Sequence, residues 1–112
     1  MLEVITAAAR AVVEDLGRGM IHEVFARCDP SEVTEEVFRE VLREHHVRLV
    51  SPATGQFRIT GVYPVDYGDC PTWAVEAPVW TAEEGESDLT LSMLIEVRNE
   101  VIGIKLTNFR VL

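Results

Sequence analysis

The side chains with the most chemical potential lie in residues 80–91, which read Trp-Thr-Ala-Glu-Glu-Gly-Glu-Ser-Asp-Leu-Thr-Leu. Four carboxylates follow one aromatic ring within nine residues. An aromatic side chain next to charged groups is a common anchor at protein interfaces. The spacing therefore predicts a partner-binding surface made of Trp80, Glu83, Glu84, Glu86 and Asp88.

The same segment also has a purely structural interpretation. Thr81 and Glu84 stand three residues apart, which is the spacing of a capping box, and Gly85 follows where a helical turn would end. Ser87 or Asp88 could then accept hydrogen bonds from nearby backbone amides. The two interpretations are compatible, because a compact turn can also present acids to a partner.

The acidic character extends beyond this segment. No Lys or Arg occurs from Ile59 to Val97, whereas eight acids fall inside that stretch. The whole chain of 112 residues carries 19 Asp and Glu against 10 Lys and Arg, a net charge of −9. Such a field favours encounter with a basic protein partner and argues against nucleic acid, which needs clustered cations.

A second group of side chains suggests enzyme chemistry. Tyr63, Asp66, Tyr67 and Trp73 could line a pocket in which a carboxylate beside aromatic rings has a raised pKa and acts as a base. The alternative is a loop rich in turn-forming Asp and Gly. No nucleophile-elbow, zinc-protease or phosphate-loop motif is present, so we predict no catalytic residues and lean against an enzyme.

Cofactor, metal and compartment follow from further absences in the sequence. The acids do not follow the spacing of a calcium loop and no C-x-x-C pair occurs, so we expect no metal and no cofactor. The first residues lack the basic region of a secretory signal, and no apolar run could span a bilayer. We therefore expect a cytoplasmic protein without membrane contact, in which Cys28 and Cys70 are free thiols.

The first half of the chain shows helical periodicity. Apolar residues at spacings of three and four predict a helix over residues 2–16, which Gly17-Arg18-Gly19 ends. A short second helix is expected to bury Ile21, Val24 and Phe25. The third helix is expected to start at Asp29-Pro30, with Thr34 as an alternative cap one turn later.

After a linker at residues 51–56, the hydrophobic period changes to two, which is typical of strands. Strands are predicted over residues 57–65, 73–79, 89–95 and 102–106, with a tight turn at Asn99-Glu100. Pro78 cannot donate a hydrogen bond to a neighbouring strand, so it should lie at an edge or an interruption of the sheet.

This order of elements predicts a single α+β domain over residues 1–112, with helices over about 1–46 and the sheet over about 57–112. Short connections favour a four-stranded antiparallel meander with three helices packed on one face. The domain is expected to have one core between the helices and the sheet.

The pattern W-T-x-E-E-G-x-S-D-L-T-L at residues 80–91, in a chain whose last residues are Val111-Leu112, resembles an uncharacterised family of small bacterial proteins. That resemblance implies no activity. The element order also resembles the NTF2-like and cystatin-like group, which packs helices against a curved antiparallel sheet. The hairpin that NTF2-like proteins carry between their second and third helices has no room here, which leaves their deep pocket in doubt.

Three functions are compatible with these observations. The first is a non-catalytic binding protein whose acidic face engages a basic protein partner, as a bacterial immunity protein would. The second is a small NTF2-like pocket enzyme or ligand-binding protein. The third is a homodimer whose sheets pack together, with a role that the sequence does not indicate.

Overall fold

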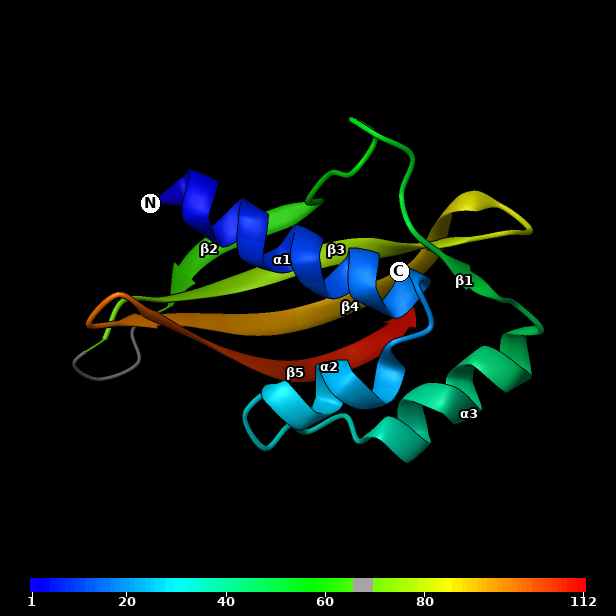
Figure 1. The fold of residues 1–112 in the computed structure, drawn as a ribbon, viewed down its shortest axis with the longest axis horizontal. Coiled ribbons are helices and arrows are strands. Elements are labelled where there is room, and N and C mark those ends of the chain that lie inside the picture. The colour runs from blue at the N-terminus through cyan, green and yellow to red at the C-terminus, as the bar shows by residue number, and fades with distance from the viewer. Residues whose placement is uncertain (66–69) are drawn as a thin grey trace.

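The fold is known from a computed structural model, which describes residues 1–65 and 70–112. It is an α+β fold, as the sequence predicts, with three helices followed by one antiparallel sheet (Figure 1). The sheet has five strands, so the prediction of four was wrong. The elements are α1 (Leu2–Gly17), α2 (Ile21–Arg27), α3 (Glu35–His45), β1 (Leu49–Val50), β2 (Gly61–Val65), β3 (Thr72–Thr81), β4 (Gly85–Arg98) and β5 (Val101–Val111).

The additional strand, β1, shares one edge of β3 with β2. β2 pairs with residues 72–76 of β3, whereas Leu49 and Val50 pair with Thr81 and Trp80 at the other end of the same strand. Strands β2 to β5 form the expected antiparallel meander. A strand of two residues is too short to show an alternating pattern, which is why the sequence did not reveal β1.

Pro78 lies between the two segments that pair with this edge of β3. The carbonyl of Glu76 accepts a hydrogen bond of 2.9 Å from the amide of Thr60, so the Glu76 carbonyl points to the shared edge. Backbone groups two residues apart in a strand point to the same side, so those of Pro78 also face the shared edge. Neither β1 nor β2 pairs with Pro78. The predicted interruption at Pro78 is therefore confirmed, and no ladder bond is lost there.

Helix α1 lies across the sheet and buries the face that its periodicity predicts (Figure 1). Ile5, Ala9, Val12 and Leu16 are buried, although Leu2 in the first turn is exposed. The helix reaches the start of the β1–β2 connection at Gly17. A Cβ atom there would lie 2.3 Å from the backbone nitrogen of Ser51, so only glycine permits this approach.

The core fills the space between α1, α2, α3 and the inner face of the sheet. Its sheet side consists of alternate residues of β3, β4 and β5, and on its helix side Phe38 of α3 stacks on Phe109 with 4.3 Å between ring centroids. Phe25 of α2 meets the edge of Phe38 at 5.6 Å. The buried hydrophobic residues of the sheet are Val75, Ala77, Val79, Leu89, Leu91, Met93, Ile95, Leu106 and Phe109.

Helix α3 begins later than its predicted start at Asp29-Pro30, which was wrong. It begins at Glu35, and Thr34, the alternative cap, accepts a hydrogen bond of 3.2 Å from the amide of Val37. Residues 29–33 instead run along the outer edge of β5. The amide of Asp29 donates to the carbonyl of Ile104 at 2.8 Å, so tertiary hydrogen bonds override a local start signal.

This edge segment protects a strand that would otherwise be open to pairing. The amide of Glu32 donates to the carbonyl of Leu106 at 3.0 Å, and the amide of Leu106 donates to the Ser31 hydroxyl at 2.8 Å. Covering an edge in this way removes a template for aggregation. The segment thereby joins the helical half of the chain to the last strand.

Candidate functional site

The β3–β4 hairpin is the segment that the sequence singled out, and its local hydrogen bonds confirm the structural interpretation. The Thr81 hydroxyl accepts a hydrogen bond of 3.1 Å from the amide of Glu84. Gly85 adopts a φ of 74°, a conformation that favours glycine. The Ser87 hydroxyl accepts from the amide of Leu89 at 3.1 Å, so the turn and the strand that leaves it are both fixed locally.

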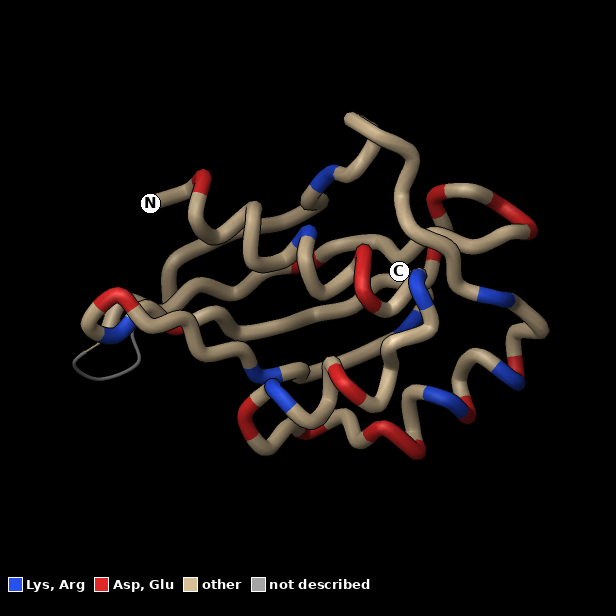
Figure 2. The backbone as a smooth tube through the Cα atoms, viewed as in Figure 1, with Lys and Arg blue, Asp and Glu red and all other residues tan. Residues whose placement is uncertain are grey.

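Two of the four predicted acids are held by arginines from the connections that flank β1. Glu83 accepts from the amide of Arg48 at 2.9 Å and from its side-chain Nε at 3.3 Å. Glu86 accepts two hydrogen bonds of 2.7 Å from Arg58. Figure 2 shows these acids on the hairpin and arginines on the neighbouring connections. Arginines from outside the Lys- and Arg-free stretch therefore neutralise part of its negative charge.

These contacts shift the acid–base behaviour of both carboxylates. The backbone hydrogen bond from Arg48 lowers the pKa of Glu83 below its usual range. The side-chain hydrogen bonds from Arg58 lower the pKa of Glu86 in the same direction. Both groups remain charged at neutral pH and tie the hairpin to the chain segments on either side of β1.

The other two acids, Glu84 and Asp88, are exposed, and no cation within the described part of the chain forms an ion pair with either. Glu84 accepts only a hydroxyl hydrogen bond of 3.2 Å from Ser87. Glu84 and Asp88 are both lining residues of a hollow of about 150 Å³ between the end of α3, the hairpin and the end of β5. The other lining residues are His45, Val47, Ser87, Leu89 and Val111.

The hollow combines two acidic residues with apolar lining residues, which together match a long basic side chain. Lys and Arg bury their aliphatic stems on apolar surface while the charged head stays near water or an acid. Val47, Leu89 and Val111 can contact such a stem, and Glu84 and Asp88 can bind its head. His45, another lining residue, donates from Nδ1 to the carbonyl of Val41 at 2.9 Å.

Trp80 differs from the exposed anchor that the sequence suggested, because its ring is half-buried. It pairs with Val50 on one side and Glu86 on the other, and its ring lies 3.8 Å from where a Cβ on Gly85 would be. Its indole nitrogen is buried and has no partner among the residues described. Trp80 therefore packs under the hairpin.

The second predicted cluster is divided by the sheet. Tyr63 pairs with Ala74 and Trp73 pairs with Pro64, so Tyr63 and Trp73 lie on opposite faces. Trp73 packs against the core, whereas Tyr63 is exposed and donates to the Glu76 carboxylate at 3.1 Å, which raises the pKa of Tyr63. Asp66 and Tyr67 lie outside the described residues.

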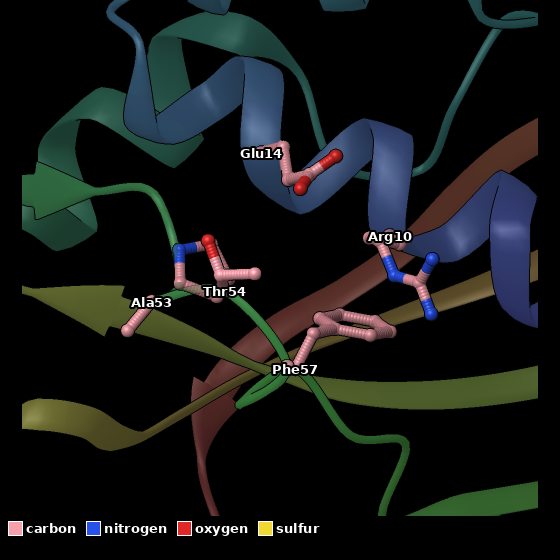
Figure 3. Close-up of a pocket in the computed structure, with 7 residues that line it drawn as sticks. Arg10, Glu14, Ala53, Thr54 and Phe57 are labelled. Carbon is pink, nitrogen blue, oxygen red and sulfur yellow. The ribbon is translucent and has the colours of Figure 1, made fainter.

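Two further concave features were not predicted from the sequence. A pocket of about 290 Å³ lies between α1 and the β1–β2 connection, where Arg10, Glu14 and Phe57 meet (Figure 3). An open groove of about 430 Å³ lies between α1, the end of α2 and β5. Both join residues far apart in the chain, so no local motif could have indicated them.

The groove contains one of the two cysteines and an ion pair. Asp15 accepts a hydrogen bond of 2.7 Å from Arg27, which lowers the pKa of Asp15. Cys28 is half-buried, and burial raises the pKa of its thiol, so it stays protonated at neutral pH. Ala8, Ala11, Ile102 and Ile104 supply the rest of the lining.

Over residues 1–65 and 70–112, no group of three or more His, Cys, Asp or Glu side chains is placed to hold a metal ion. No helix described here combines the length and the apolar character needed to cross a membrane.

Fold and sequence together define an α+β protein with helices over one face of an antiparallel sheet. Residues 13–112 match a domain of unknown function, DUF7668, and the chain belongs to this family. No curated protein and no solved structure matches the chain. The matched span contains the whole hairpin and its hollow but not Arg10.

Proposed function

We propose that this protein is a non-catalytic binding protein whose β3–β4 hairpin end engages a basic protein partner. The observation that carries the proposal is the hollow where Glu84 and Asp88 have no ion pair in the described structure and adjoin an apolar wall. A lysine or arginine of the partner would enter it, with its stem on Val47, Leu89 and Val111.

The paired acids support this binding by fixing the shape of the hairpin. Arg58 and Arg48 hold Glu86 and Glu83 from two different connections, so the free carboxylates stand on a restrained frame. Less conformational entropy is then lost when a partner binds. The surplus of nine negative charges adds long-range attraction to a basic surface.

The finer parts of the proposal rest on the element order and on charge. Helices followed by an antiparallel sheet support the likeness to the NTF2-like and cystatin-like group. Small size and acidity are compatible with a bacterial immunity protein acting in the cytoplasm. Such a protein would neutralise a basic toxin by covering part of its surface.

The proposal is tested by capture of partners from the native host with matched variants. The test variant carries Glu84→Lys and Asp88→Lys, and the control carries Glu3→Lys and Glu100→Lys, which change the net charge equally at the other end of the molecule (Figure 1). Circular dichroism first establishes that both variants fold.

The two variants are expected to behave differently. A basic protein should be recovered with the natural chain and the control, and should be lost with the test variant. Recovery that is equal for all three chains, or the absence of any basic protein with the natural chain, would contradict the proposal.

A ligand-binding function is the second candidate, and the groove beside α1 favours it. Its lining of Ala8, Ala11, Ile102 and Ile104 is apolar, and the Asp15–Arg27 pair adds two polar groups at one end. Pockets for small molecules combine these features. The natural chain should increase the fluorescence of ANS, a dye that reports apolar binding surface. Ala11→Trp would fill the groove and should abolish this increase. Ala7→Trp, on the exposed side of α1, should leave the increase unchanged.

A further inference from the structure

The pocket between α1 and the β1–β2 connection brings two opposite charges to one side of the helix (Figure 3). Arg10 and Glu14 are one helical turn apart, and four-residue neighbours of opposite charge commonly pair on a helix. In the described structure no ion pair joins them. Figure 3 shows the Arg10 side chain directed to Phe57 and the Glu14 side chain separate from it.

Phe57 explains why Arg10 does not turn to Glu14. The guanidinium carbon of Arg10 lies 5.8 Å from the centroid of the Phe57 ring, within the range of a cation–π contact. A guanidinium carries five N–H donors, and none of those of Arg10 forms a hydrogen bond within the described part of the chain. Arg10 can therefore donate to an anionic group in the pocket without losing its position.

The opposite wall of the pocket is fixed to the helix by a hydrogen bond next to Glu14. The Ser51 hydroxyl donates to the backbone carbonyl of Glu14 at 2.8 Å, and the amide of Gln56 closes a turn on the carbonyl of Ala53 at 2.9 Å. Residues 52–55 therefore stand at a set distance from α1. The Glu14 carboxylate remains available as an acceptor beside Thr54.

We propose that this pocket binds a small zwitterion of the α-amino acid class. Arg10 would hold the carboxylate of the ligand, Glu14 would hold its ammonium group, and the ligand side chain would rest against Phe57 and Pro52. Arg10 and Glu14 are one helical turn apart, so the ends of their long side chains can reach two charged groups on one small ligand. A volume of about 290 Å³ is sufficient for an amino acid.

The site is independent of the hairpin hollow, so either proposal can fail alone. The two features have no lining residue in common. The pocket involves the middle of α1 and residues 52–57, whereas the hollow involves α3, the hairpin and the end of β5. A ligand here would restrain the β1–β2 connection, which also carries Arg58.

The test is an NMR titration of the ¹⁵N-labelled protein with L-leucine and two analogues. N-acetyl-L-leucine lacks the ammonium charge and L-leucine amide lacks the carboxylate. The variants are Arg10→Gln and Glu14→Gln, and the controls are Glu3→Gln in the first turn of α1 and Arg18→Gln directly after the helix. Thermal unfolding first shows that all four variants fold.

L-Leucine should shift the amide signals of Thr54, Gly55 and Phe57 in the natural chain. Its affinity should be about tenfold weaker or more in each test variant and unchanged in the two controls. Both analogues should bind correspondingly weaker than L-leucine. Equal binding of N-acetyl-L-leucine and L-leucine would overturn the zwitterion assignment. The absence of any shift at tens of millimolar L-leucine would overturn the site.

Discussion

Arg58 and Glu86 form a two-point ion pair, with Nε to Oε1 and Nη2 to Oε2 both at 2.7 Å. It links the β1–β2 connection to the first residues of β4, which lie 28 positions apart in the chain. Arg48 and Glu83 make a second link on the other side of the same hairpin. The two pairs hold the segment that presents Glu84 and Asp88.

The two pairs predict different responses of their carboxylates to arginine removal. Arg58→Gln removes the main cause of the lowered pKa of Glu86, so this pKa should rise toward 4.5. Arg48→Gln should raise the pKa of Glu83 less, because the backbone amide of residue 48 is the largest cause and remains. Side-chain ¹³C titration by NMR measures both values.

The Arg58–Glu86 pair determines one part of the pH dependence of stability. Because folding lowers the pKa of Glu86, its contribution is complete above the ordinary value of 4.5 and is lost as the pH falls through the folded value. In the Arg58→Gln variant, the free energy of unfolding should therefore depend less steeply on pH below pH 4.5. An unchanged acid profile in this variant would contradict the role of the pair.

Gly17 and Gly19 should respond differently to substitution, although only one residue separates them. Gly17→Ala places a Cβ 2.3 Å from backbone atoms of residues 50 and 51, so we expect a loss of about 3 kcal/mol or more in unfolding free energy. Gly19 has open space but a φ of 83°, so Gly19→Ala should cost about 1–2 kcal/mol. Urea denaturation measures both.

Substitution by asparagine separates the steric clash at Gly17 from the positive φ at Gly19. Asparagine tolerates the left-handed conformation, so Gly19→Asn should cost less than Gly19→Ala, whereas Gly17→Asn should be as damaging as Gly17→Ala. A Gly17→Asn variant that is clearly more stable than Gly17→Ala would show that the close approach of α1 to the β1–β2 connection is not what requires Gly17.

Ser31 is predicted to protect the outer edge of β5. Its hydroxyl accepts from the buried amide of Leu106 and donates to the carbonyl of Asp29, both at 2.8 Å. Ser31→Ala leaves that amide without its acceptor and should cost about 1 kcal/mol. Hydrogen exchange of the Leu106 amide should quicken in Ser31→Ala and stay near the natural rate in Ser31→Thr.

Much of the fold follows from local patterns because the core side chains alternate with the expected period. Ile5, Ala9, Val12 and Leu16 on α1 are buried as predicted, and the turn at Asn99-Glu100 forms with both φ values positive. The errors arise where tertiary hydrogen bonds decide. The 29–33 segment pairs with β5 instead of starting a helix, and two residues of β1 extend the sheet.

The candidate site was only partly visible in the sequence for the same reason. The local turn at Thr81, Glu84 and Gly85 was predictable from spacing. The pairing of Glu86 with Arg58 and the hollow with Val47 depend on segments brought together by the fold. The sequence therefore located the acids but not which of them are free.

The most direct test of the central claim is binding of a basic side chain in the hollow. The ¹⁵N-labelled protein is titrated with a short alanine peptide that carries one lysine, and with the same peptide carrying norleucine. We predict saturable shifts at Val47, Glu84, Asp88 and Val111 with the lysine peptide alone, weakened by salt and lost in the Glu84→Gln, Asp88→Gln variant. Equal shifts with both peptides, or none at the hollow, would contradict the claim.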